Sequence, residues 1–359
     1  MLAAMNIYPS HSLALALWRA WSVSHPVSLR DFHESGKRKG LSLPAHQLAA
    51  SAHIKSCART KADIERIALA LPEDVRDSLD RGGACPGERA PWEVLVGKSP
   101  GARSTDELRR HQCALTFPRN AFFEMAPQVW VSSPELVFAQ MAGRLEYGEL
   151  LALGYELCGC YPIDGGNGFL VRCPLTTPER LRAFLGQMRN ARAVKLARSA
   201  AQQVRRKSAS IMETELAIVS LTPRRRGGLG LPDARLNEPL ILGEKGGRVA
   251  RRQRVVGDLC WVERSVIVEY NGRESHRGVG AQVRDSRRHD ALLAEGIDMT
   301  TVTSSQFANV YEFSELMGEV SRKVGKTFRG WAPGQIESHM ELRQQVRSFH
   351  HRHYPRSSA

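Results

Sequence analysis

The stretch from residue 257 to residue 272, GDLCWVERSVIVEYNG, decides the fold of the C-terminal part of this chain. Residues 266–270 are β-branched and apolar apart from Glu269, which is typical of a largely buried strand. Residues 262–265 are polar enough to form a turn between this strand and a preceding one that carries Asp258. A tight antiparallel hairpin would therefore bring Asp258 and Glu269 to the same end of the ladder.

Two carboxylates at the open end of a hairpin need a counter-charge. Burying an ionised carboxylate alone costs several kcal/mol, so Asp258 and Glu269 require a partner or a cation. Hard divalent ions such as Mg²⁺ and Mn²⁺ prefer oxygen ligands of this kind. The same pattern also fits an ordinary α/β domain in which both carboxylates are merely ion-paired.

The segments around this hairpin predict a mixed sheet flanked by helices. Gly296 stands at a helix C-cap position, and residues 299–303 are rich in β-formers. We expect the order αββαβα, with one further strand possible at 239–243. The expected elements are a helix at 211–220, strands at 251–261 and 265–271, a helix at 280–295, a strand at 299–303 and a helix at 304–324.

The pattern D-x10-E-Y-N-G, followed by a His and a basic helix that contains RD and RR, resembles the PD-(D/E)XK nucleases. More narrowly, residues 205–326 are similar to the small bacterial endonuclease-like domain related to very-short-patch-repair (Vsr) endonucleases. The resemblance covers about a third of the chain. It implies a restriction-endonuclease-like C-terminal domain with a mixed sheet. The residues before it predict a mostly helical N-terminal region, so the expected fold class of the whole chain is α+β.

The resemblance also implies a metal centre. Asp258, Glu269 and the backbone carbonyl of Tyr270 would be the ligands of Mg²⁺ or Mn²⁺. Glu213 falls where the family places an acidic residue on a helix that faces the metal, which makes it a further catalytic candidate. Its alternative explanation is a capping box, because Ser210 precedes it by three residues.

Position 271 departs from the family pattern. A basic residue of an E-x-K motif would stand there, and Asn271 cannot act as a general base or carry charge. His276, seven residues after Glu269, is the expected replacement to orient or deprotonate water or to protonate the leaving group. Its alternative is an ordinary histidine in a surface loop.

Basic residues near the hairpin are candidates for contacts with backbone phosphates. Arg288 lies on the helix predicted at 280–295, while Arg252 and Arg254 lie at the start of the strand predicted at 251–261 and flank the active hairpin in sequence. Such contacts position a nucleic acid but do not read its sequence.

The composition points to a polyanionic partner. The formal net charge is +14, from 51 Lys and Arg against 37 Asp and Glu, and the 42% hydrophobic content is ample for two folded domains. No apolar run approaches a membrane span, so we expect DNA and not a membrane as the polyanionic partner.

The seven cysteines lack C-x2-C spacing, which favours a reducing cytoplasm over a disulfide framework or a zinc ribbon. The glycine-rich segment 165–168 lacks a following Gly-Lys-Ser/Thr, so no nucleotide cofactor is expected.

Three segments are expected along the chain: an N-terminal domain at 1–204, which could divide near 128, the nuclease-like domain at 205–330, and a basic tail at 331–359. Residues 129–142, VWVSSPELVFAQMA, also resemble a segment of AbiEi-type antitoxins and regulators. No helix-turn-helix is evident upstream of that segment. The role of residues 1–204 and the oligomeric state are left open.

These observations favour a metal-dependent DNA endonuclease, with DNA repair or defence against phages and mobile elements as its setting. The alternative is a non-catalytic DNA-binding regulator or antitoxin-like protein that retains a degenerate nuclease fold. Asn271 and the AbiEi-like segment support the alternative. A requirement for a divalent ion in activity, but not in DNA binding, separates the two.

Overall fold

The structure, a computed structural model, describes residues 6–28, 45–46, 65, 71–73, 75–76, 91–96, 104–112, 117–161, 170–189, 193–250, 254–272 and 279–353. The chain divides into two compact units: unit 1 comprises residues 1–146 and 162–202, and unit 2 comprises residues 147–161 and 203–359. The predicted domain boundary at residue 204 lies beside the third crossing between the units, at residues 202 and 203. Helix α6 (Tyr147–Cys158), which falls inside the predicted N-terminal domain, is part of unit 2.

Unit 1 combines helices with short strands. The described helices are α1 (His11–Ser24), α5 (Pro134–Met141), α7 (Pro178–Gln187) and α8 (Val194–Ala201). The described strands are β1 (Pro26–Ser28), β2 (Ala45–His46), β3 (Trp92–Val96), β4 (Leu108–Gln112), β5 (Phe122–Ala126), β6 (Val129–Ser132) and β7 (Leu170–Arg172), which form three small sheets in the orders β1-β7, β2-β5-β6 and β3-β4. The prediction of a mostly helical N-terminal region missed most of these strands, because each is too short to show a clear two-residue alternation.

The helix starts of unit 1 follow the sequence signals. Ser133 and Thr177 precede prolines, and their side chains accept the backbone N–H of Leu136 and Arg180. Helix α1 packs against α5 and β6, and its Trp18 is fully buried and donates its Nε1–H to the carbonyl of Ser132 at 2.7 Å.

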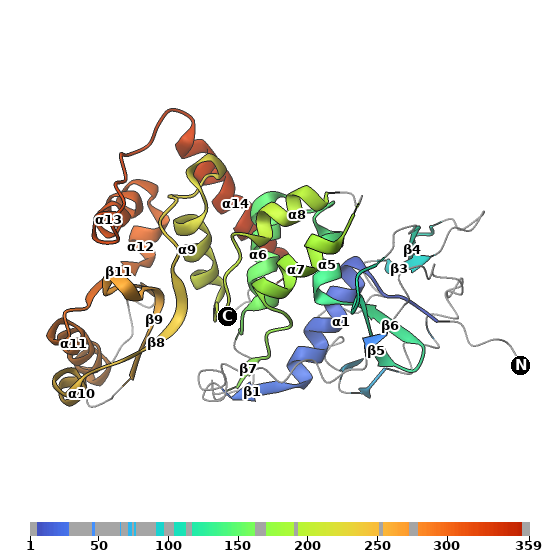
Figure 1. Cartoon of the computed structure of the whole chain (residues 1–359), viewed down its shortest axis with the longest axis horizontal. Helices are drawn as coiled ribbons and strands as arrows, with labels where there is room; N and C mark the ends of the chain where they lie inside the picture. The colour runs from blue at the N-terminus through green and yellow to red at the C-terminus, as the bar shows by residue number, and fades with distance from the viewer. Residues whose placement is uncertain are drawn as a thin grey trace, which may run out of the picture. The chain divides into compact units, whose positions relative to one another are not determined.

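Unit 2 is built on one four-stranded sheet with the order β11-β10-β9-β8. Figure 1 labels β8, β9 and β11 of this sheet. Its elements follow the predicted positions within a few residues and add α10, η1 and α14. They are α9 (Ile211–Leu221), η1 (Arg224–Arg226), β8 (Arg235–Ile241), α10 (Glu244–Ala250), β9 (Arg254–Trp261), η2 (Val262–Arg264), β10 (Val266–Asn271), α11 (Val279–Ala294), β11 (Asp298–Thr303), α12 (Ser304–Ala308), α13 (Val310–Lys323) and α14 (Gln335–His353). The predicted α+β class and the mixed sheet are confirmed.

The hairpin forms as predicted. Strands β9 and β10 are antiparallel, and the turn between them contains η2 and Ser265, whose φ of 54° lies in the left-handed region. Strand β8 extends the sheet antiparallel to β9, whereas β11 pairs parallel to β10 after the crossover through α11. None of the helices in the described ranges is long and apolar enough to cross a membrane.

One face of this sheet packs against α11. Val255, Ile267 and Leu292 belong to the buried cluster between them. Gly257 on β9 is required by the close approach of the neighbouring strand, because a Cβ atom there would lie 2.4 Å from Cγ2 of Ile267 on β10. The strand therefore passes close to its neighbour immediately before Asp258.

Helix α14 packs within unit 2 against α6 and α9. Its Leu342, Val346 and Phe349 are buried, and its Arg343, with 2% of its surface exposed, bonds to Glu215 on α9. The segment predicted as a basic tail thus contains a helix with a buried apolar face, whose spacing of three to four residues is that of an amphipathic helix.

Candidate active site

Asp258 and Glu269 meet where the β9–β10 ladder opens. The last pairs of that ladder are Cys260 with Ile267 and Leu259 with Val268, so the next pair in the same register would set Asp258 opposite Glu269. The ladder ends before that pair, and the two carboxylates line a cavity of about 300 Å³. The cavity is lined by Val256, Asp258, Glu269, Tyr270, Asn271, Arg288, Met299 and Thr301.

The Asp258 carboxyl is held in an environment that disfavours its charge. Burial, followed by the nearby negative charges of Glu213 and Glu269, raises its pKa from 3.8 to about 7. Its Oδ2 accepts the backbone N–H of Tyr270 at 2.7 Å, and this bond together with Arg288 opposes the rise. Among the described residues, that N–H is the only hydrogen-bond donor to Asp258, so its second oxygen can accept a further partner in the cavity.

Glu269 is neutralised by an arginine on the neighbouring helix. Both of its carboxylate oxygens accept from the guanidinium of Arg288, with a distance of 2.9 Å from Nη1 to Oε2. The same guanidinium also donates to the carbonyl of Val256 on β9. This two-bonded fork is the geometry in which arginine binds carboxylates and phosphates most firmly.

Glu213 lies behind the cavity and not in its lining. Its carboxylate accepts the backbone N–H of Ala209 at 2.9 Å and the side-chain amide of Asn237 on β8. Ser210 in turn caps α9 by accepting the N–H of Glu213 at 3.1 Å. The Ser210 half of the expected capping box is therefore present, whereas the Glu213 carboxylate bonds to Ala209 and not to the N-cap residue Ser210. The charge of Glu213 still acts on Asp258.

The remaining predicted site residues are distributed as follows. Tyr270 and Asn271 line the cavity, so the position of the motif's basic residue faces the two carboxylates. Arg254 is exposed at the start of β9 and does not line the cavity. His276 and Arg252 lie outside the described residues.

Two lining residues on β11 were not predicted from the sequence. Thr301 pairs with Glu269 in the parallel ladder, and Met299 pairs with Ile267. The only signal for them is the alternation of β11, which places residues 299 and 301 on the same face of the sheet. No cluster of three or more His, Cys, Asp or Glu side chains suited to a metal ion occurs among the described residues.

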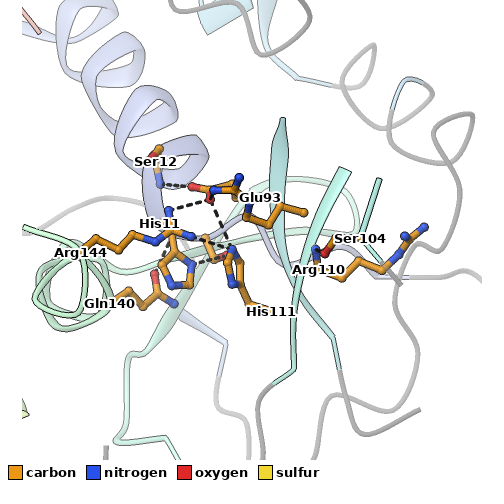
Figure 2. A network of polar contacts seen from close by, with 10 residues as sticks. His11, Ser12, Glu93, Ser104, Arg110, His111, Gln140 and Arg144 are labelled. Carbon is orange, nitrogen blue, oxygen red and sulfur yellow. Dashed lines mark hydrogen bonds and ion pairs between the residues drawn. The ribbon is translucent and has the colours of Figure 1, made fainter. Parts of the chain in front are cut away.

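Unit 1 holds a separate polar network, shown in Figure 2. The carboxylate of Glu93 on β3, 2% exposed as a residue, accepts the backbone N–H of Ser12 at 2.8 Å and contacts Arg144 at 2.6 Å. Burial by itself would raise the pKa of Glu93, but His111, Ser12 and Arg144 lower it to about 2. The ring centroids of His11 and His111 lie 3.9 Å apart, with the two rings tilted by 35°. Burial, with the nearby His111 and Arg144, lowers the pKa of His11 to about 3.

This network joins the first turn of α1 to three other segments. Arg144 also donates to Nε2 of His111 at 3.1 Å, and Gln140 accepts the backbone N–H of His11 at 2.9 Å. Every charged group in it is matched to a partner within the unit, so we assign it to the stability of unit 1. No sequence pattern predicts this network, because its members are scattered from residue 11 to residue 144.

Comparison with known proteins adds no relative. No family model matches the chain, and no curated protein or solved structure is significantly similar to it. The geometry of the site is therefore the basis for a functional assignment.

Proposed function

We propose that unit 2 is a metal-dependent DNA endonuclease that hydrolyses phosphodiester bonds. The observation that carries the proposal is the pair Asp258 and Glu269, brought from adjacent strands to one cavity whose lining also contains Arg288. Two carboxylates and an arginine are suited to hold a divalent ion and a phosphate next to each other.

The order of elements in unit 2 supports a nuclease-like core. A helix, three antiparallel strands, a helix and a parallel fourth strand follow one another from α9 to β11, with α10 inserted after β8. The carboxylates lie on the second and third of these strands. This arrangement is what the resemblance to the PD-(D/E)XK nucleases implies, and the restriction-endonuclease-like fold is part of the proposal.

The donor set fits Mg²⁺ or Mn²⁺. Asp258 has one oxygen available to the cavity. Its ionised form is destabilised by the charges of Glu213 and Glu269, which a cation would offset. The anionic donors are carboxylate oxygens, which are the hard ligands that these ions prefer. Asp258, Glu269 and the carbonyl of Tyr270 would hold the ion, which when bound polarises a phosphoryl oxygen and lowers the pKa of water. Arg288 would bind the phosphate, and His276 would transfer the proton in place of Asn271.

DNA is the substrate that the charge of the chain favours. A formal net charge of +14 raises the affinity for a polyanion irrespective of sequence, and this attraction weakens as salt is added. Arg254, exposed at the start of β9, would contribute a contact to the phosphate backbone outside the cavity. Arg252, which lies outside the described residues, is proposed as a further phosphate contact.

The test is nicking of supercoiled plasmid by the purified full-length protein in Mg²⁺, Mn²⁺ or EDTA. Asp258→Asn and Glu269→Gln should each reduce metal-dependent nicking by about a hundredfold or more, since each removes a charge that holds the ion. Glu263→Gln is the matched control, because Glu263 lies in the turn of the same hairpin with its side chain 75% exposed. Nicking that persists in EDTA, or in both site variants, would refute the proposal.

A second candidate is a DNA-binding protein without catalysis. It is favoured by the Arg288 fork, which already saturates Glu269, and by the uncharged Asn271 in the cavity lining. In that case the wild type and both site variants would retard plasmid equally in a gel, with and without EDTA, and leave it uncut.

A further inference from the structure

Among the described residues that line the cavity, Arg288 is the cationic side chain. Its guanidinium binds both oxygens of Glu269 and the carbonyl of Val256, and so links α11 to the two strands that carry the carboxylates. A divalent ion that takes Glu269 as a ligand must compete with this fork for the same oxygens. The side chain of Arg288 is 32% exposed and lines the cavity, so it is not confined by close packing on all sides.

The charges of the lining side chains set what the site can hold. With Asp258 and Glu269 ionised and Arg288 charged, their sum is −1. One divalent ion changes this to +1, and a single phosphodiester anion then brings it to zero. A second divalent ion would leave a surplus of +2 among the lining groups, which the single negative charge of nearby Glu213 does not offset. Such a surplus is unfavourable in a half-buried cavity.

We propose that Arg288 exchanges partners: it neutralises Glu269 in the metal-free protein and, when one divalent ion binds Glu269, moves to a phosphate oxygen of the substrate. The inference rests on the proposed function, and it adds a stoichiometry of one ion and a coupling between ion and phosphate. The guanidinium fork fits a phosphate as well as it fits a carboxylate, so the exchange replaces two hydrogen bonds to the Glu269 carboxylate with two hydrogen bonds to phosphate oxygens. Ion and phosphate therefore bind cooperatively. The phosphate draws Arg288 away from Glu269 and so frees Glu269 for the ion, while the ion on Glu269 frees Arg288 for the phosphate.

The experiment measures Mn²⁺ binding to the full-length protein by electron paramagnetic resonance of the free ion. The phosphate probe is a thymidine dinucleotide with a methylene phosphonate linkage, which keeps the negative charge but lacks the scissile P–O bond. In the wild type we expect one Mn²⁺ per chain and an affinity about tenfold higher in the presence of the dinucleotide.

Arg288→Met separates the two effects. Without the competing guanidinium, the variant should bind Mn²⁺ alone at least about threefold more tightly than the wild type, and the dinucleotide should no longer raise the affinity. Arg287→Met is the matched control, because Arg287 is the exposed neighbour on α11 and does not line the cavity. It should behave like the wild type in both measurements.

The outcomes that overturn the inference are distinct from those that overturn the proposed function. If the wild type binds Mn²⁺ and Asp258→Asn abolishes this binding, while Arg288→Met leaves affinity and coupling unchanged, the exchange is wrong and the metal site stands. If neither the wild type nor Arg288→Met binds Mn²⁺, both are wrong. Should Arg288→Met fail to fold by near-ultraviolet circular dichroism, Arg288→Lys decides, since it keeps the charge but loses the fork: a weaker coupling supports the exchange and an unchanged coupling refutes it.

Discussion

Replacing Asp258 by Asn should stabilise the metal-free protein. The folded state raises the pKa of this carboxyl from 3.8 to about 7, so the folded chain prefers the protonated form and is destabilised when the group ionises. The destabilisation is absent below the unfolded pKa, grows as the pH rises, and is complete above the folded pKa. A shift of this size corresponds to at most about 4 kcal/mol at pH 8, and solvent in the cavity reduces this to about 2 kcal/mol.

The measurement is urea unfolding of the wild type and Asp258→Asn in EDTA at pH 5 and pH 8. Asn keeps an oxygen that can accept the backbone N–H of Tyr270, so the local geometry is retained. We expect the free energy of unfolding of the variant to exceed that of the wild type by about 2 kcal/mol at pH 8 and by a smaller amount at pH 5. Equal stabilities at pH 8, or a gain that is larger at pH 5, would refute the electrostatic account of the site.

Three further substitutions test other parts of the fold. Glu93→Gln should destabilise the protein by about 3 kcal/mol at pH 7, because the folded state lowers the pKa of this carboxyl from 4.5 to about 2. The ionised carboxylate stabilises the folded state above pH 4.5, and this stabilisation is lost as the pH falls toward 2. Urea unfolding of both proteins from pH 7 to pH 3 measures the size of the effect and its pH trend. Arg343→Met should lower the free energy of unfolding by about 3 kcal/mol, because it removes a buried cation that pairs with Glu215. In a double-mutant cycle, the further change Glu215→Gln should recover part of this loss. Asn309→Ala should lower the free energy of unfolding by about 1 kcal/mol, because the Asn309 side chain accepts the N–H of Tyr311 at the start of α13, and Asn309→Ser should retain most of the stability.

The hairpin could be predicted from local sequence. The apolar run at 266–270 and the polar turn at 262–265 each carry their own signal, and the antiparallel register then follows from the length of the turn. The proximity of Asp258 and Glu269 was accessible for the same reason. Helix starts at Ser133 and Thr177 were equally local, because a cap acts on backbone groups only two or three residues away.

The roles of Arg287 and Arg288 could not be predicted from local sequence. Arg287 and Arg288 are adjacent on one helix, and the sequence does not state how α11 is rotated against the sheet. Only the packing of Leu292 and its neighbours onto β9 and β10 directs Arg288 to Glu269 and leaves Arg287 exposed. The position of Glu213 relative to the cavity could not be predicted either, because it depends on where α9 lies over the sheet.

By itself, the sequence determined the strands, the turn and the two carboxylates of the candidate site, because these depend on interactions between residues close in the chain. The tertiary structure decided that Glu269 has an arginine as its partner while Asp258 keeps an open oxygen. It also decided that Glu93 is neutralised by groups from α1, β4 and the end of α5, and that α6 packs with unit 2. Those outcomes depend on burial and on contacts between segments far apart in the chain, which no local pattern encodes.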